Sequence, residues 1–433
     1  MSVVICGAGI AGVATAFHLS VEHGLADVVV CDPRPPLTLT SDKSTECYRN
    51  WWPNRNMVGF MNRSIDILEE LDRRSEGAFH LNRRGYLYVT ASPERLAAME
   101  AEADAVVGHG AGPLRRFPPE PGGPDGADLL DRRTLVARYP SLTGEAVGGL
   151  LVHRAGWMSA QQLGAWMLER AIDAGVRLLP HAVVAVEVDD EAVAAVGLSD
   201  GSTLPTGFFV DAAGPMVGPV AELVGVALPM LSEAHHKVAF RDHLGVVERS
   251  APMLIWCDDQ QIPWSPEEAG MLVEAGRPEL TATMPPFCHG RPEGGDGSDW
   301  VLALWEHTRT VMEPAWPMPH DELYPEVVMR GMATMLPGLT AYLDRLPQPF
   351  VDGGYYTKAP DNLPVVGPIG PNGFHVCGGL SGYGVMAAPA AGELAAQHIL
   401  NHDLPTWAEA FSPTRFDDPA YLASIESSDA GQL

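Results

Sequence analysis

Three glycines near the start of the chain have the spacing of a phosphate-binding turn. Gly7, Gly9 and Gly12 follow a short apolar run, residues 2–6, and precede a stretch with helical spacing. The first glycine allows a tight turn, the second lets the backbone approach a pyrophosphate, and the third lets the helix pack on the strand. The N-terminus of that helix directs free N–H groups and a positive dipole end at the phosphates. These residues therefore predict a dinucleotide site.

An acid stands where such a unit needs one. Residues 11–23 form the expected helix, Gly24 ends it, and residues 28–32 form a second buried strand that ends in Asp32. A carboxylate at this place accepts hydrogen bonds from the ribose hydroxyls of adenosine. The fingerprint by itself is compatible with NAD and with FAD. Three further neighbours of the turn and the acid are expected to contact the dinucleotide: Ile10, Ala11 and Pro33.

Beyond this unit the pattern alternates between helices and strands. Helices are predicted at residues 57–73, 161–174 and 324–335, strands at 85–90, 183–188 and 208–211, and a glycine turn opening a long helix at 378–400. Residues 32–56 and 108–128 are expected to be loops. Residues 226–347 are expected to hold one helix among short strands, and the tail after Asp418 is expected to be disordered.

Composition excludes several classes of partner. The chain has 28 basic and 55 acidic residues, a net charge of -27, which repels the phosphates of nucleic acid. Its six cysteines are scattered without a CxxC pair or a zinc spacing, so neither a metal site nor a disulfide scaffold is indicated. No apolar run approaches the ~20 residues of a membrane span. Because the first strand begins almost at Met1, leaving no room for a signal peptide, we expect a cytoplasmic protein without membrane insertion.

Four separated stretches carry a family resemblance. They are the N-terminal fingerprint, Gly156-Trp157 before its helix, residues 210–215 (VDAAGP), and a C-terminal run of residues 356–361 (YTKAPD), 364–368 (PVVGP), 378–384 (GGLSGYG) and 388–389 (AP). Together they resemble the D-amino-acid oxidase superfamily of flavoproteins, which includes glycine oxidase, sarcosine oxidase and dimethylglycine dehydrogenase. The resemblance implies FAD as the cofactor.

The resemblance also implies the fold. We expect an α/β FAD-binding domain of the Rossmann-like, glutathione-reductase type, interleaved with an α+β substrate domain on an antiparallel sheet. The implied FAD-binding segments are residues 1–88, 146–225 and 348–405. Residues 89–145 and 226–347 then form the substrate domain, and 406–433 a C-terminal tail.

The C-terminal glycine turn favours FAD over NAD. Reduced flavin carries negative charge near N1 and the C2 carbonyl, and a helix starting at Gly384 can direct unpaired N–H groups at it. Glycines at 378, 379, 382 and 384 let the backbone approach a ring system. An ordinary N-cap by Ser381 is the alternative, but it explains the serine and not the glycines. Here and elsewhere the resemblance implies FAD contacts from Ser41, Ser44, Thr45, Cys47, Val183, Ala213, Gly214, Gly354, Gly379, Leu380, Ser381, Gly382, Tyr383, Gly384, Val385 and Met386.

Candidate substrate residues also come from the resemblance. Setting Thr45 on the sarcosine oxidase pattern places Arg49 where that enzyme binds a carboxylate, a role that suits the planar guanidinium. Residues 301–307 (VLALWEH) resemble the segment with an oxygen-activating lysine and an active-site histidine, and put Ala303 and His307 at those positions. Arg291 is a third candidate. A structural ion pair for Arg49 and a structural, hydrogen-bonded histidine for His307 remain open alternatives.

Covalent attachment of the flavin is a separate hypothesis. Gly354 stands where sarcosine oxidase has its flavin-linking cysteine, so that link cannot form. In dimethylglycine dehydrogenase a histidine ends a Ser-Thr-Xaa-His stretch, and here residues 44–47 (STEC) place Cys47 at that position. A thioether from Cys47 to FAD is one interpretation and a buried free cysteine is the other.

The resemblance implies FAD-dependent oxidation of a C–N bond in an amino acid or amine. The substrate's carboxylate would pair with Arg49, hydride would pass to flavin N5, and water would hydrolyse the imine. With Ala303 and Met386 in place of family lysines, the electron acceptor is either O2 or, in a flavin dehydrogenase, a quinone or protein carrier. A non-catalytic FAD-binding assembly factor is a further alternative. The substrate and the oligomeric state stay open at this level.

Overall fold

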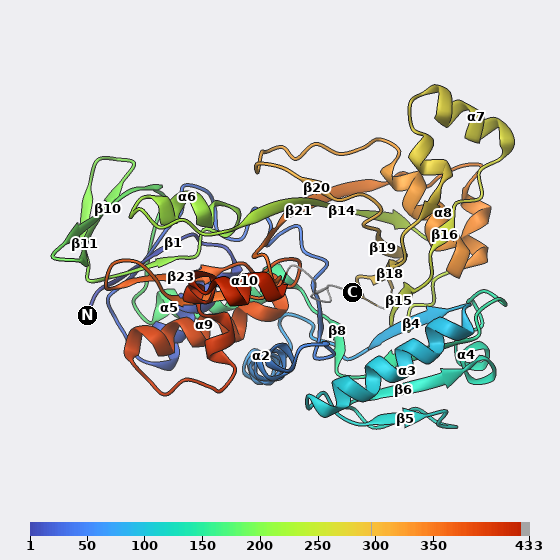
Figure 1. Cartoon of the computed structure of the whole chain (residues 1–433), viewed down its shortest axis with the longest axis horizontal. Coiled ribbons are helices and arrows are strands. Elements are labelled where there is room, and N and C mark those ends of the chain that lie inside the picture. Colours follow the sequence, from blue (N-terminus) through green and yellow to red (C-terminus); the bar gives the residue numbers. More distant parts are fainter. Residues whose placement is uncertain (296, 426–433) are drawn as a thin grey trace.

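The computed structural model describes residues 1–295 and 297–425. It consists of two parts side by side, each built on its own sheet (Figure 1). The part at the left of the view holds the N-terminal unit, and the part at the right holds a larger sheet with helices α3, α7 and α8. The long strand β14 runs from one part toward the other. No helix of the described residues is long and apolar enough to cross a membrane.

The first sheet is a mainly parallel sheet of six strands, as the sequence predicts for a dinucleotide-binding domain. β1 pairs in parallel with both β2 and β13, β13 pairs in parallel with β23, and only β22 is antiparallel to its neighbour. Every residue of β1 and β2 is buried, which agrees with their apolar sequences. In sheet order the strands are β22 (Val365–Pro368), β23 (Phe374–Gly378), β13 (Phe208–Asp211), β1 (Val3–Cys6), β2 (Val28–Cys31) and β9 (Arg177–Leu179).

Two helices of small residues pack closely beside this sheet. α1 (Ile10–Phe17) runs into a π-helical turn, η1 (His18–Glu22), and α9 (Gly384–Leu400) lies against α1. A Cβ on Gly392 would lie 2.6 Å from the backbone carbon of Ala14, so the two helices touch backbone to backbone. The helix predicted at residues 11–23 is α-helical only as far as Phe17 and continues as the π-helical turn η1. Within that turn the Ser20 hydroxyl donates to the carbonyl of Ala16. Further helices of this part are α2 (Arg55–Arg74), α5 (Ala160–Asp173), α6 (Val217–Glu222) and η2 (Gly214–Met216).

The second sheet has ten strands and is mostly antiparallel. Along the main path its strands are β20 (Thr310–Val311), β14 (Leu231–Arg241), β19 (Trp300–Leu304), β18 (Cys288–Glu293), β15 (Met253–Trp256), β4 (Tyr86–Thr90), β7 (Gly148–Val152), β6 (Ala127–Asp131) and β5 (Leu114–Arg116). The tenth strand, β21 (Phe350–Lys358), pairs with β14. β4, β7 and β21 thus join the large sheet although most or all of their residues fall in segments expected to bind FAD. The domain boundaries themselves stay a prediction.

Helices and small sheets complete the fold. Helices and helical turns beside the large sheet are α3 (Pro93–Gly108), α4 (Arg132–Arg138), α7 (Pro266–Glu274), α8 (Tyr324–Met335), η3 (Pro278–Thr281) and η4 (Pro337–Tyr342). The small sheets pair β3 (Cys47–Arg49) with β8 (Ala155–Trp157), β16 (Gln260–Gln261) with β17 (Thr283–Met284), and β10 (Val183–Asp189), β11 (Ala192–Leu198) and β12 (Thr203–Pro205) with one another.

The structure corrects four local predictions. Residues 226–347 hold a second helix, α7, which begins with a capping box between Ser265 and Glu268. The loop expected at 32–56 contains strand β3, and the one expected at 108–128 contains β5 and the start of β6. The expected disorder after Asp418 is wrong for α10 (Pro419–Ile425), and residues 426–433 lie outside the described residues.

The C-terminal segment is held by a buried ion pair. It first forms the helical turns η5 (Ala408–Phe411) and η6 (Pro413–Asp417). Arg415 then donates to both carboxylate oxygens of Asp361, at 2.7 and 3.0 Å, and the Tyr421 hydroxyl donates to the same carboxylate at 2.6 Å. Both charged side chains are almost fully buried, so loss of either partner leaves the other unpaired at high cost. Residues 415–421 are thereby fixed to the residue-356–361 motif.

Candidate active site

Three adjoining cavities run from the edge of the six-stranded sheet to the face of the large sheet. We call them the edge cavity (at Gly7, Asp32 and Gly379), the middle cavity (at Ser44, Lys237 and Gly354) and the inner cavity (at Arg49, Tyr86 and Glu306). They enclose about 780, 510 and 510 Å³. The edge and middle cavities share Ile10, Ser41, Ser381 and others, and the middle and inner cavities share Thr45, Leu304, Tyr356 and Gly382.

The edge cavity lies where four parallel strands end. Gly7 follows β1, Asp32 follows β2, Ala212 follows β13, and Gly379 follows β23. The carboxyl ends of parallel strands are the usual place for a dinucleotide. Asp32 already accepts hydrogen bonds from the N–H groups of Ala8 and Arg34, both at 2.9 Å, which fixes its carboxylate at the cavity wall.

Glycine is required at two positions of this turn. Gly7 has φ of 107°, and a Cβ there would lie 2.4 Å from the carbonyl oxygen of Ala212. A Cβ on Gly12 would lie 2.0 Å from the carbonyl oxygen of Gly7. Gly12 itself lines none of the described cavities. Its part is to let α1 approach the turn, as the fingerprint predicts.

Two helices begin at these cavities without a side-chain cap. The N-cap residues are Gly9 for α1 and Tyr383 for α9, and neither makes a side-chain capping hydrogen bond. The alternative that Ser381 caps α9 is therefore wrong. Ser381 instead lies at φ of 46°, and its buried hydroxyl has no hydrogen-bond partner among the described residues. Helix ends and a buried hydroxyl with this surplus of donors suit an anionic or polar ligand.

Most of the sequence-predicted cofactor residues line the three cavities, although Gly12, Pro33 and Val183 do not. Val183 lies in β10, where it pairs with Leu198 of β11. The residues that do line them are Gly7, Gly9, Ile10, Ala11, Asp32, Ser41, Ser44, Thr45, Cys47, Ala213, Gly214, Gly354, Gly379, Leu380, Ser381, Gly382, Tyr383, Gly384, Val385 and Met386.

A family model identifies the chain on independent grounds. The model of FAD dependent oxidoreductases of the DAO type matches residues 2–398. The chain belongs to this family. It is an FAD-dependent oxidoreductase, and no curated protein sequence gives a significant match to it.

Solved structures agree with this fold. L-proline dehydrogenase from P. horikoshii is 18% identical with a TM-score of 0.76, covering 96% of this chain and 97% of its own. Glycine oxidase from Geobacillus kaustophilus is 17% identical with a TM-score of 0.74, covering 96% and 98%. Iminodiacetate oxidase from Chelativorans sp. BNC1 is 18% identical with a TM-score of 0.71, covering 95% and 98%. At such identities the likeness shows the DAO-type fold.

The residues of the edge and middle cavities fit FAD. The glycine turn after β1 and the N-terminus of α1 suit a pyrophosphate, and Asp32 suits a ribose. The unpaired Ser381 hydroxyl and the start of α9 lie farther along, at the middle cavity. Lys237 adds a cation there: its ammonium group donates to the carbonyl of Ser44 at 2.7 Å, and burial lowers its pKa. Among the described residues no group of three His, Cys, Asp or Glu side chains could hold a metal.

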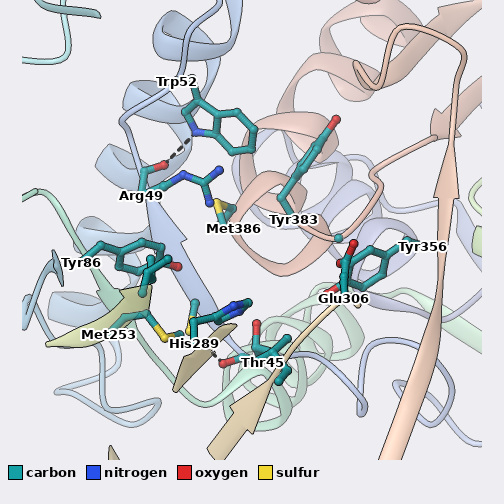
Figure 2. Close-up of a pocket in the computed structure, with 14 residues that line it drawn as sticks. Thr45, Arg49, Trp52, Tyr86, Met253, His289, Glu306, Tyr356, Tyr383 and Met386 are labelled. Carbon is teal, nitrogen blue, oxygen red and sulfur yellow. Dashed lines mark hydrogen bonds between the residues drawn. The ribbon is translucent and has the colours of Figure 1, made fainter. Parts of the chain in front are cut away.

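Arg49 occupies one side of the inner cavity (Figure 2). It extends from β3, and its guanidinium carbon lies 4.2 Å from the centre of the Trp52 ring, close enough for a cation–π interaction. Its Nε donates to the carbonyl of Trp51 at 3.3 Å, and the Trp52 indole donates to the carbonyl of Arg49 at 3.1 Å. The side chain is thus held in a buried position with its charged end at the cavity. The rest of the wall is largely aromatic and apolar, with Tyr86, Met253, Tyr356, Tyr383 and Met386.

Glu306 lies on another side of the same cavity, beside Tyr356 (Figure 2). It forms an ion pair with Nδ1 of His235, whose Nε2 lies 3.3 Å from the carboxylate of Glu233. Lys358 donates to Glu233 at 2.5 Å, and the His235 ring stacks on Tyr356 with centroids 3.6 Å apart. Burial opposes the charge on Glu306, but the His235 hydrogen bond and the positive charge of Lys358 hold its pKa below the ordinary value. The hydrogen bond from His235, with that from Lys358, likewise lowers the pKa of Glu233 to about 2.

The structure places Glu306, and not His307, at the cavity. Side chains alternate across a strand, so a one-residue shift exchanges the two faces. Leu304 lines the middle and inner cavities and Glu306 follows two residues later, whereas Ala303 is buried in the core on the opposite face. His307 lines none of the described cavities, and burial lowers its pKa. Both its ring nitrogens lack a hydrogen-bond partner among the described residues, so the alternative of a hydrogen-bonded structural histidine is not what the structure shows.

Of the two other candidates, Cys47 lies at a cavity and Arg291 does not. Arg291 is fully buried and lines none of the cavities; it donates to the carbonyl of Thr45 at 2.8 Å and pairs with Glu293 at 2.5 Å. It therefore supports the loop that carries Thr45. Cys47 does line the inner cavity, its Sγ lies 3.1 Å from the carbonyl of Thr45, and burial raises its pKa, which disfavours the thiolate. A thioether to FAD stays a prediction.

Gly12→Ala tests the close approach of α1 to the turn. Because the added methyl would overlap the Gly7 carbonyl, α1 must shift away from the phosphate site. We expect purified Gly12→Ala protein to carry well under half of the flavin absorbance per chain. Gly218→Ala, in α6 with open space around the new methyl, is the matched control and should retain full flavin. Equal flavin content in both variants would contradict the assignment.

Proposed function

We propose that the protein oxidises the C–N bond of an amino acid or of another amine that carries a carboxylate. The observation that carries the proposal is the placement of a buried arginine, Arg49, and a half-buried carboxylate, Glu306, in one cavity beside the flavin site. Such a pair matches the two charges of an amino-acid zwitterion. The similar folds named above are named for proline, glycine and iminodiacetate, which all combine an amine with a carboxylate.

Each residue of the cavity has a definable part in this reaction. The planar guanidinium of Arg49 binds the carboxylate with two parallel hydrogen bonds. Glu306, oriented by His235, accepts a hydrogen bond from the substrate amine. This hydrogen bond fixes the distance between the amine and the middle cavity. The aromatic walls exclude water and so strengthen both interactions.

The chain's contribution to the chemistry is orientation more than a strong base. Bound FAD supplies the two-electron acceptor, and the amine becomes an imine that water hydrolyses. Two fixed attachment points, at Arg49 and Glu306, hold the substrate so that its α-C–H is presented toward the middle cavity.

Arg49→Ala tests the carboxylate site. Removal of one partner of a buried, hydrogen-bonded charge pair should raise KM for a carboxylate substrate roughly 30-fold or more. The decarboxylated amine of the same substrate lacks the interaction, so its KM should change by no more than about threefold. Steady-state kinetics on both compounds give the comparison. Equal effects on the two would show that Arg49 acts on structure and not on the carboxylate.

Two neighbouring residues just beyond the end of β19, one at the cavity and one away from it, provide a paired test. Glu306→Gln keeps the shape but removes the charge facing the amine, and should lower kcat/KM about tenfold or more. His307→Gln lies away from the cavities and should stay within about twofold of the parent. Flavin content and thermal midpoint serve as folding controls. The reverse order of effects would restore His307 as the active-site residue.

A flavin dehydrogenase that passes electrons to a carrier is the second candidate. The observation that favours it is that the residues facing the cavities from segment 301–307 and from the start of α9 are Leu304 and Met386, and not lysines. We then expect turnover with an artificial quinone to exceed turnover with O2, and less than one peroxide to form per substrate oxidised in air. Stoichiometric peroxide would instead make the protein an oxidase, with Lys237 as the cation in the middle cavity.

A further inference from the structure

A fourth cavity adjoins the inner cavity on the other side of Arg49. We call it the outer cavity; it lies between the large sheet and helix α3, at Arg49, Tyr88, Met99, Ala103 and Phe287. Its empty space, part of which is open to solvent, is about 1490 Å³, against about 510 Å³ for the inner cavity. Arg49 lines both, so the guanidinium assigned to the substrate carboxylate stands at their junction.

The inner and outer cavities lie next to each other along the same part of the large sheet. Three neighbouring segments each contribute one side chain to the inner cavity and, two residues along, another to the outer cavity. Within β4, Tyr86 and Tyr88 point to the same face and lie about 6.6 Å apart, while Cys257 and Phe287 lie just beyond the ends of β15 and β18. Ile255 pairs with both Tyr88 and His289 across the ladder, which aligns the three segments. The inner and outer residues are Tyr86 and Tyr88, Ile255 and Cys257, and His289 and Phe287.

Apart from Arg49 at the junction, the outer cavity is apolar inside, and its other charged residues are partly exposed. Met99, Ala103 and Val106 of α3 are buried and face it. Burial raises the pKa of the Cys257 thiol to about 12, so that side chain is neutral. The charged pair on α3, Arg95 and Glu102 at 2.7 Å, is satisfied within itself and partly exposed. A hydrocarbon or aromatic group would gain most from this lining.

We propose that the outer cavity binds the side chain of the substrate, and that the substrates are amino acids with long aliphatic or aromatic side chains. The inference rests on the proposed function, because it takes Arg49 as the carboxylate anchor. With the carboxylate at the junction and the amine at Glu306, the side chain is the one substituent left to extend along the sheet past Arg49. The apolar lining and the size of the outer cavity then favour substrates that reach into it.

A series of unbranched amino acids, from alanine through 2-aminobutyrate and norleucine to 2-aminooctanoate, measures this directly. Both enantiomers are tested, by anaerobic flavin bleaching and by steady-state kinetics on the holoenzyme. Each methylene buried should raise kcat/KM about fourfold. A flat or falling series, with measurable turnover of alanine or glycine, would overturn the inference and leave the proposed function standing. Absence of bleaching by every amino acid would overturn both.

Ala103→Phe assigns the effect to the outer cavity. Ala103 is fully buried and faces this cavity, so the phenyl ring fills part of it. We expect kcat/KM for 2-aminooctanoate to fall about tenfold or more, and that for alanine to stay within about twofold. Ala97→Phe, at an exposed position of α3 that does not line the cavity, is the matched control and should change neither.

A second variant keeps the test decisive if Ala103→Phe folds poorly. Met99→Ala enlarges the same cavity, and should shift the optimum of the series toward longer side chains. Flavin content and thermal midpoint report folding in each variant. An equal loss for short and long substrates in a well-folded Ala103→Phe protein, or an unchanged optimum in Met99→Ala, would overturn the assignment.

Discussion

The contact between Gly12 and the carbonyl of Gly7 is the constraint on which the cofactor site depends. With no side chain between them, α1 starts directly over the turn that ends β1. α9 in turn packs on α1 through Gly392, with no room for a Cβ. Two helix N-termini therefore meet the carboxyl ends of the parallel strands at fixed positions, one at the edge cavity and one at the middle cavity. Positive helix ends placed in this way stabilise negative charge without any movement of the protein.

The long β14–β21 ladder brings charged groups to the same region from the large sheet. His235 lies opposite Gly354, and Glu233 lies opposite Tyr356, with Lys358 two residues beyond. The His235 ring stacks on its diagonal neighbour Tyr356 and also reaches Glu306. On the same ladder, a Cβ on Gly354 would lie 3.2 Å from Lys43 and 3.3 Å from Thr40. The glycine at the position of the cysteine link of sarcosine oxidase thus lets β21 pack closely on the segment that holds Thr40 and Lys43.

The sequence predicted best what is encoded in contiguous residues. The N-terminal fingerprint and the turn around Gly382 are local motifs, and the family match and the cavities agree with the cofactor assigned from them. The resemblance also selected Arg49 as a substrate residue, and Arg49 does line the inner cavity, although its role there is still a proposal. His307 lies away from the described cavities, and its role stays a prediction, because pairing of β19 with distant strands decides which of the residues that follow it meets the cavities. Lys237 and Glu233 were missed for the same reason: they meet the site only through β14, whose partner β21 is more than a hundred residues away. The sequence also contains the signal for α7, because Ser265 and Glu268 have the spacing of a capping box, but α7 was not predicted.

The position of Arg49 suggests how one cavity system could separate chemistry from selectivity. Every amino acid has the same carboxylate and amine at its α-carbon, and these would be held in the inner cavity by groups that the two sheets fix in place. The side chain is the variable part, and on this proposal it would lie under α3. That helix lines the outer cavity but contributes no residue to the inner one, so substitutions on it leave Arg49 and Glu306 in place. Selectivity could then change through residues such as Met99 and Ala103 while the geometry of the oxidation step stays the same, because the arginine at the junction belongs to β3 and not to α3.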